Sequence, residues 1–144
     1  MTIFARAVLV AALLLAAPVA AQAGDTEAVV WKSPSCGCCQ GWIDYLKRNG
    51  YTAKVIDVDD LDAIKAGMGV PEAMQSCHTA RIGGYIVEGH VPVEAIDRLL
   101  AEKPKVVGIA SPGMPTGSPG MSGPKAPNPV FTFGRGDPKL FGDY

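Results

Sequence analysis

Four cysteines of this chain fall at spacings that suit metal or redox chemistry. Three are packed into the tetrapeptide 36–39 (CGCC), and the fourth, Cys77, is followed at once by His78. Cys36 and Cys39 have the C-x-x-C spacing of a redox-active dithiol. Three sulfurs in four residues exceed what a two-electron dithiol needs, and neighbouring thiolates can share bridging ions of a soft, low-valent metal. The cluster therefore favours metal binding, with or without redox chemistry, over a purely redox or structural pair.

Further candidate ligands lie later in the chain. His90 follows a predicted strand, and the two histidines flank one predicted hairpin, whose paired ends would bring them within about 10 Å of each other. Two copies of the tetrapeptide SPGM, at 111–114 and 118–121, carry Met114 and Met121, whose thioethers suit Cu(I). The alternatives are a surface or capping histidine, incidental methionines in a flexible linker, and a disulfide role for Cys77.

Zinc fits this donor set less well than copper. Structural zinc sites prefer two separated pairs of cysteine or histidine ligands. The dense C-x-C-C pattern does not lay out a tetrahedral cage, and zinc has no use for the methionines. Copper uses all three ligand types.

The elements that must position these residues follow from hydrophobic periodicity and turn signals. Strands are predicted at 28–31, 51–58, 79–82 and 85–88, and helices at 39–49, 61–66 and 92–102. The resulting order, β-α-β-α-β-β-α, with a cysteine motif between the first strand and the first helix, predicts a thioredoxin-like α/β fold. The C-x-x-C motif would then lie at a helix amino terminus, where backbone N–H groups and the helix dipole favour a thiolate.

Length and composition exclude some classes of protein. A chain of 144 residues forms one small domain, and a net charge of −1 with 7% aromatic residues supplies no basic surface for nucleic acid. Residues 110–144 contain seven glycines and seven prolines, which predicts a Gly/Pro/Met-rich extension. Short strands at 130–133 and 139–141 could close a marginal hairpin within it.

The amino terminus has the pattern of an export signal. Arg6 precedes an apolar run at 7–17, a helix-breaking Pro18 and an A-x-A site that ends at Ala23. We therefore expect cleavage after Ala23, no stable membrane insertion afterwards, and a periplasmic location where unprotected thiols oxidise. The expected division is a signal peptide at 1–23, a thioredoxin-like metal-binding domain at 24–109 and the extension at 110–144.

Four motifs together resemble the CopG-type periplasmic copper-resistance proteins, a family long described only as a domain of unknown function and as metal-binding proteins. They are the CGCC tetrapeptide, Cys77-His78, the run 84–92 (GYIVEGHVP) and the loop 112–121 with its two Pro-Gly-Met copies. The resemblance implies a thioredoxin-like domain that binds copper as a multinuclear Cu(I)–thiolate cluster. It also implies a role in handling the oxidation state of copper. The family pattern implies an acidic residue and a longer apolar strand after the methionine loop. Here Ser122 follows Met121 and the strand at 130–133 is short, which puts that last strand in question.

The resemblance also assigns roles to residues. The thiolate ligands would be Cys36, Cys38, Cys39 and Cys77. Further ligands would be His78 or His90 and Met114 or Met121.

Two other functions remain open. A thiol-disulfide oxidoreductase would use Cys36 and Cys39 on protein disulfides, and these two cysteines could equally couple disulfide formation to electron transfer with bound copper. An interaction domain stabilised by two structural disulfides is the other possibility, and in such a domain the methionines would have no role. Copper ions, other periplasmic copper-resistance proteins and a redox partner are the expected partners.

Overall fold

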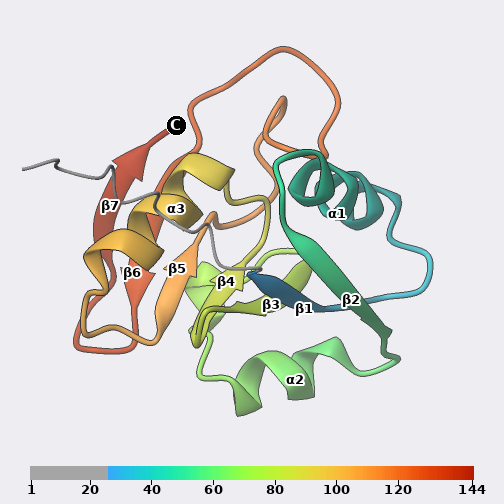
Figure 1. The fold of residues 1–144 in the computed structure, drawn as a ribbon. Coiled ribbons are helices and arrows are strands. Elements are labelled where there is room, and N and C mark those ends of the chain that lie inside the picture. Colours follow the sequence, from blue (N-terminus) through green and yellow to red (C-terminus); the bar gives the residue numbers. More distant parts are fainter. Residues whose placement is uncertain (1–25) are drawn as a thin grey trace, which may run out of the picture.

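The computed structural model describes residues 26–144, so the predicted signal peptide lies outside the described residues. The described chain contains seven strands, three α-helices and one 3-10 turn (Figure 1). In chain order these elements are β1 (Glu27–Lys32), α1 (Gly37–Arg48), β2 (Thr52–Asp57), α2 (Leu61–Gly67), η1 (Glu72–Met74), β3 (His78–Ile82), β4 (Tyr85–Glu88), α3 (Val93–Glu102), β5 (Gly108–Ala110), β6 (Pro129–Phe133) and β7 (Lys139–Asp143).

All seven strands belong to one mixed sheet in the order β2-β1-β3-β4-β5-β6-β7. The β1–β2 and β4–β5 pairs are parallel, because a helix crosses over between the two strands of each pair, and the remaining pairs are antiparallel. The β3–β4 hairpin turns through Gly83 and Gly84, which both have positive φ angles of 55° and 87°. Glycine adopts this backbone conformation without steric cost, so the turn is encoded locally.

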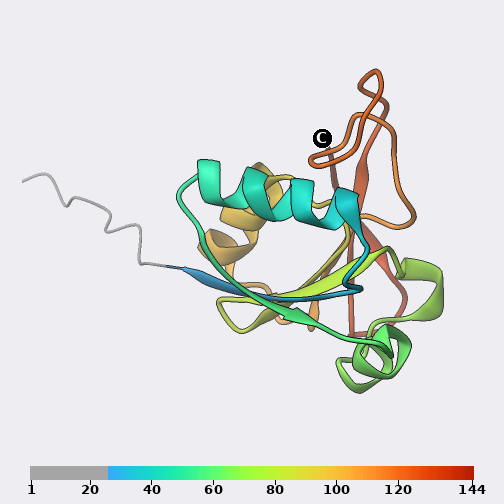
Figure 2. The same cartoon turned by 90° about the vertical axis from the view of Figure 1, so that its right-hand side faces the viewer.

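Helices cover both faces of the sheet (Figure 2). Helices α1 and α3 lie on one face and α2 lies on the other. Helix α1 buries Trp42, Ile43 and Leu46 completely, and α3 buries Ile96 and Leu99 in the same core. Each such side chain contributes roughly 1.5–3 kcal/mol on burial, so this core fixes α1, and with it the cysteine motif, against the sheet.

The mixed α/β class is confirmed, and the seven predicted elements occur in the predicted order. The thioredoxin-like assignment stays a prediction. The short strand at 130–133 is present as β6, which pairs with β7 as a hairpin. Strand β5 was not predicted, and it crosses the boundary drawn between domain and extension, so the sheet continues into the extension. The division into domains stays a prediction.

No helix among residues 26–144 is both long enough and apolar enough to cross a membrane.

Candidate metal centre

The cysteine tetrapeptide lies at the amino terminus of α1. A turn after β1, closed by a 3.1 Å hydrogen bond from the Cys36 N–H to the Ser33 carbonyl, delivers Cys36 as the N-cap residue. Cys38 and Cys39 follow in the first helical turn, which holds no acidic residue. Helix N–H groups without partners and the positive end of the helix dipole therefore face the sulfurs and favour thiolate. Cys39 is buried and Cys38 is half-buried.

Sheet pairing brings Cys77 to the same place. Strand β3 runs antiparallel to β1 with His78 opposite Lys32, so Cys77, just before β3, lies beside the turn that leads into α1. The four cysteine Sγ atoms all lie within 4.8 Å of one another. Cys36 and Cys39 form a disulfide in this structure, while Cys38 and Cys77 are free thiols with their Sγ atoms 3.8 Å apart. The structure thus joins the two cysteine motifs into one cluster of four sulfurs.

The two histidines join the cluster through Cys77. Hairpin pairing sets Thr79 opposite Glu88, which places the residues just outside this pair at one end of the sheet. The Cys77 Sγ lies 2.9 Å from His90 Nε2 and 3.4 Å from His78 Nδ1, and the two imidazole rings meet edge to face with centroids 5.0 Å apart. Cys77, His78 and His90 therefore form a second donor group that shares Cys77 with the first.

The surroundings set the protonation of both histidines. His90 Nδ1 lies 2.7 Å from the Pro119 carbonyl oxygen, which can only accept, so Nδ1 carries the proton and Nε2 offers its lone pair towards Cys77. Burial lowers the pKa of His90. Burial, followed by the charges of His90 and Lys65, lowers the pKa of His78 well below its usual value. Both rings are therefore neutral at pH 7, which is the metal-binding form of imidazole.

These depressed pKa values predict that acid destabilises the metal-free protein. Below the ordinary histidine pKa of about 6.5, the unfolded chain binds a proton that folded His78 does not bind, so stability falls as the pH falls. We expect His78 to account for about 2 kcal/mol of lost unfolding free energy between pH 7 and pH 5. Urea unfolding of the unaltered chain and of His78→Gln at both pH values measures this difference. An equal acid loss in the two proteins contradicts the prediction.

The Cys77 thiol is held in its protonated form in the metal-free protein. Burial, followed by the charge of Cys38 and a hydrogen bond with it, raises the pKa of Cys77 to about 12. A thiol beside a bare imidazole nitrogen donates its proton there, which matches the short Cys77–His90 contact. A soft metal ion that replaces this proton would gain the Cys77 sulfur and the His90 nitrogen together, so binding would release protons.

The two methionines lie on the extension that folds back over the start of α1. Met114 is 56% exposed, and Met121 is half-buried. Their neighbours do contact the site: the Ser76 hydroxyl donates to the Gly113 carbonyl, and Gly120 packs on the first turns of α1. The loop that carries both thioethers thus crosses the site, while the role of the thioethers themselves stays a prediction.

Gly120 lies where no other residue fits. Its φ is +86°, and an added Cβ would lie 2.5 Å from the Trp42 nitrogen and 2.7 Å from the Cys38 carbonyl oxygen. We expect Gly120→Ala to destabilise the protein by about 2–4 kcal/mol, from left-handed strain and a backbone clash. Gly113→Ala is the control, because Gly113 has a φ of +68° but open space around it. Thermal unfolding of both variants measures the difference, and equal losses would mean that the close approach to α1 contributes nothing.

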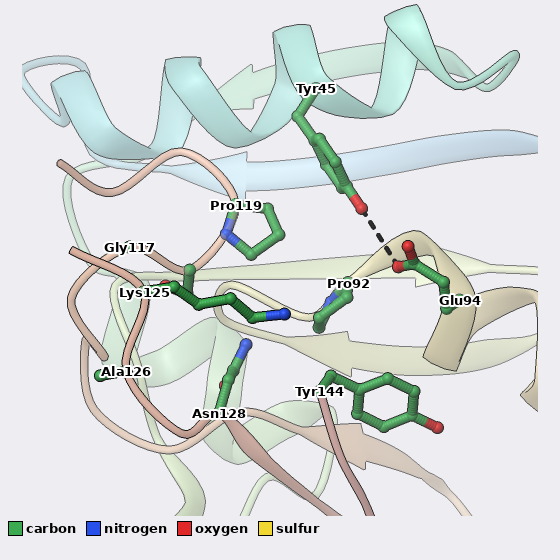
Figure 3. Close-up of a pocket in the computed structure, with 10 residues that line it drawn as sticks. Tyr45, Pro92, Glu94, Gly117, Pro119, Lys125, Ala126, Asn128 and Tyr144 are labelled. Carbon is green, nitrogen blue, oxygen red and sulfur yellow. Dashed lines mark hydrogen bonds between the residues drawn. The ribbon is translucent and has the colours of Figure 1, made fainter. Parts of the chain in front are cut away.

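A pocket of about 400 Å³ lies beside the site, between α1, the start of α3 and the extension (Figure 3). Its wall includes Pro119, whose carbonyl orients His90, and the Tyr45 hydroxyl donates to Glu94 across one side. No cysteine or histidine lines it. The pocket is therefore separate from the candidate metal centre.

Sequence reasoning missed several residues that shape the site. Trp42 packs against the His78 ring with centroids 4.4 Å apart, and Pro119 fixes the His90 tautomer. Lys65 and Glu88 form a buried ion pair next to the dipeptide Cys77-His78, which is called the Cys77-His78 step below. Each of these residues has a visible place in the sequence, as a tryptophan inside the first helix, a proline within the second SPGM copy and a glutamate in a strand, but each acts on the site only through the tertiary fold.

Comparison with known proteins identifies the family. The sequence family described as "Protein of unknown function, DUF411" matches residues 74–121. A solved structure titled "Copper resistance protein copG- Form 2" superposes with a TM-score of 0.78 at 39% identity, covering 83% of this chain and 98% of that one. The chain belongs to the CopG family. A second structure, "Copper resistance protein copG- Form 1", gives a TM-score of 0.76 at 40% identity over 82% of this chain and 96% of that one. No curated protein matches the chain.

The CopG match covers more than four fifths of this chain, so it extends well beyond the residues 74–121 that the sequence family matches. The resemblance read from the four sequence motifs is therefore confirmed at the level of the family. The two CopG structures are named as copper resistance proteins, and the cysteine cluster of this chain has the composition of a metal site.

Proposed function

We propose that this protein is a periplasmic copper-binding protein of copper resistance that binds Cu(I), with more than one ion in the fully reduced protein. The observation that carries the proposal is the cluster of four cysteine sulfurs within 4.8 Å, joined through Cys77 to two neutral imidazoles. Thiolates this close can each bridge two low-valent ions, which a mononuclear zinc cage does not require.

The donor set favours Cu(I) over Cu(II) and over hard cations. Thiolate is a soft ligand, imidazole is compatible with copper, and the described donor groups contain no carboxylate. The positive end of the α1 dipole favours an anionic sulfur cluster at this helix amino terminus, and bound monovalent cations would offset the cost of burying the charge of the Cys39 thiolate. In this proposal Met114 and Met121 are further ligands that the extension supplies when copper enters.

Copper redox conversion is the second part of the proposal, with Cys36 and Cys39 as the redox pair. When two thiols close to a disulfide they release two electrons and two protons. The two electrons reduce two Cu(II) ions to two Cu(I) ions, so atoms and charge balance. The disulfide between these cysteines supports the pairing, since it leaves Cys38 and Cys77 as free thiols for the product ions.

The finer structural assignment belongs to the same proposal. A strand, a cysteine motif at the start of α1 and a parallel second strand are what a thioredoxin-like fold requires, and this order supports that classification. Export with cleavage after Ala23 would deliver the chain from Gly24 onward to the periplasm.

X-ray absorption at the copper edge of the reduced, Cu(I)-loaded protein tests the proposed ligands. We expect a first shell dominated by sulfur, with a minor nitrogen contribution and scattering from a neighbouring copper. A Cys38→Ser variant should show less sulfur and weaker copper–copper scattering. A shell of oxygen and nitrogen alone would refute the proposal.

A thiol-disulfide oxidoreductase is the second candidate, favoured by the Cys36–Cys39 disulfide at a helix amino terminus. That function predicts reduction of a model protein disulfide by metal-free protein, lost on substitution of Cys36 or Cys39 and retained in Cys38→Ser. The copper function predicts a lower copper count in Cys38→Ser. The two activities are therefore separated by one variant.

A further inference from the structure

A buried ion pair lies under the Cys77-His78 step on the side of the sheet opposite α1. Lys65 of α2 and Glu88 at the end of β4 are 2% and 0% exposed, and the Lys65 Nζ lies 2.5 Å from Glu88 Oε1. The Lys65 ammonium also donates to Thr79 Oγ1 at 3.0 Å. The Thr79 hydroxyl in turn donates to Glu88 Oε2 at 2.5 Å. Both carboxylate oxygens and the ammonium are thus bonded within one closed network.

The same carboxylate contacts the chain on both sides of the Cys77-His78 step. Glu88 Oε1 accepts the Ser76 N–H at 2.7 Å, one residue before Cys77, and Oε2 accepts the Thr79 hydroxyl, one residue after His78. The His78 carbonyl is fixed separately, because it accepts the Gly89 N–H at 3.0 Å. Cys77 and His78 are therefore held between two hydrogen bonds, one at each end of the pair, that both end on the Glu88 carboxylate.

Strand alternation explains why this contact comes from the far face. Successive strand residues point to opposite faces of a sheet. His78 packs against Trp42 of α1, while Thr79 reaches Lys65 of α2, which covers the other face. The ion pair can therefore hold the backbone of the step without occupying space around the sulfurs.

Close packing leaves the step little room to shift. Gly89 follows Glu88, and a Cβ there would lie 2.4 Å from the Ser76 Cβ and 2.7 Å from the Ser111 carbonyl oxygen. Ser76 thus packs closely against Gly89, just after β4, while the Ser76 N–H donates a hydrogen bond to Glu88. Movement of Cys77 away from His90 requires that both contacts open.

We propose that Glu88, together with Lys65 and Thr79, is a positioning device for Cys77 and His78. These residues fix the positions of the Cys77 sulfur and the His78 imidazole from the opposite face of the sheet, without binding copper themselves. This inference rests on the proposed function. A buried ion pair is weak evidence for stability, since apolar replacements of similar volume are often equally stable. Its retention beside two donor residues is accounted for by the geometry that it imposes.

Thr79 supplies the sharpest test, because valine has nearly the shape of threonine and suits a strand. Thr79→Val removes both hydroxyl bonds of the network, and Thr79→Ser retains them. We expect Thr79→Val to weaken Cu(I) binding of the reduced protein about tenfold in competition with a chromophoric Cu(I) chelator, and Thr79→Ser to restore it. Unchanged affinity in Thr79→Val overturns the proposal.

Glu88→Gln should give a larger effect, with Tyr51→Phe as the matched control. Tyr51 donates to Asp97 away from the site, so its loss lowers stability without touching Cys77. Copper affinity should fall in Glu88→Gln and stay unchanged in Tyr51→Phe. If Glu88→Gln does not fold, the double variant Lys65→Met/Glu88→Leu removes the pair without leaving a buried charge, and the same fall is expected. Equal affinity in the folded variant and the unaltered chain overturns the proposal.

A metal-free measurement separates this inference from the copper function itself. With the Cys36–Cys39 disulfide intact, Cys38 and Cys77 are the free thiols of the described chain, so alkylation by iodoacetamide, located at Cys77 by peptide mass spectrometry, reports how firmly the half-buried Cys77 is held. We expect Cys77 to react at least about tenfold faster in Thr79→Val than in Thr79→Ser, because the step can then leave its place. If the unaltered chain binds no Cu(I) but this ratio holds, the copper function fails and the positioning role stands. Equal alkylation rates refute the positioning role.

Discussion

Replacement of Cys77 by serine is expected to abolish tight copper binding, whereas replacement of Cys38 should only reduce it. Within the described chain Cys77 alone belongs to both donor groups, with its Sγ 3.8 Å from Cys38 Sγ and 2.9 Å from His90 Nε2. Its loss removes the sulfur that the two donor groups share and separates the histidines from the remaining sulfurs. Since removal even of a residue that only supports a ligand costs roughly 10–100-fold in affinity, we expect a loss of at least about a hundredfold.

Cys38→Ser is the matched comparison for this prediction. It removes one sulfur of the four-cysteine group but leaves Cys77, His78 and His90 intact, so the copper count should fall while some tight binding remains. Met121→Leu should mainly weaken affinity. Copper content after dialysis against a Cu(I) chelator measures all three variants. If Cys77→Ser retains as much copper as Cys38→Ser, the central position of Cys77 in the site is wrong.

Oxidation of the Cys36–Cys39 pair is expected to lower the copper capacity of the protein. In the disulfide form two of the four sulfurs are no longer thiolates, and the free thiols are those of Cys38 and Cys77. These two sulfurs with the imidazoles suit a single ion, whereas four thiolates can bridge several. We therefore expect the reduced protein to hold more than one Cu(I) and the disulfide form to hold no more than one.

A variant that cannot form the disulfide is the control for this second prediction. Cys36→Ser removes one partner, so mild oxidation before anaerobic loading should change its copper content less than it changes that of the unaltered chain. Thiol counts before and after loading confirm the oxidation state of each sample. The same copper content in the reduced and disulfide forms of the unaltered chain would contradict the proposed capacity change.

The main elements were predictable from the sequence because local signals encode them. Gly83-Gly84 between two β-branched runs specifies the hairpin, and buried positions at helical spacing, such as Trp42 and Leu46, specify α1. Cys77 lies beside the CGCC motif because β1 and β3 are neighbours in the sheet. The β5 strand was missed because a three-residue run that contains Gly108 carries no periodic signal.

The remaining parts of the site depend on contacts between distant segments. The Pro119 carbonyl reaches His90 only because the extension folds back over α1, where Gly120 permits the close approach. Lys65 and Glu88 are residue types that usually lie on the surface, and only the fold shows that they are buried together. No pattern in the sequence predicts either contact.

The number of copper ions held by the chain from Gly24 to Tyr144 tests the proposed copper function most directly. The protein is purified anaerobically, reduced, loaded with Cu(I) and dialysed against a competing Cu(I) chelator before copper and protein are measured. We expect more than one tightly held copper per chain. A chain that retains no copper would contradict the copper function and leave the thiol-disulfide oxidoreductase as the better explanation of the cysteine motif.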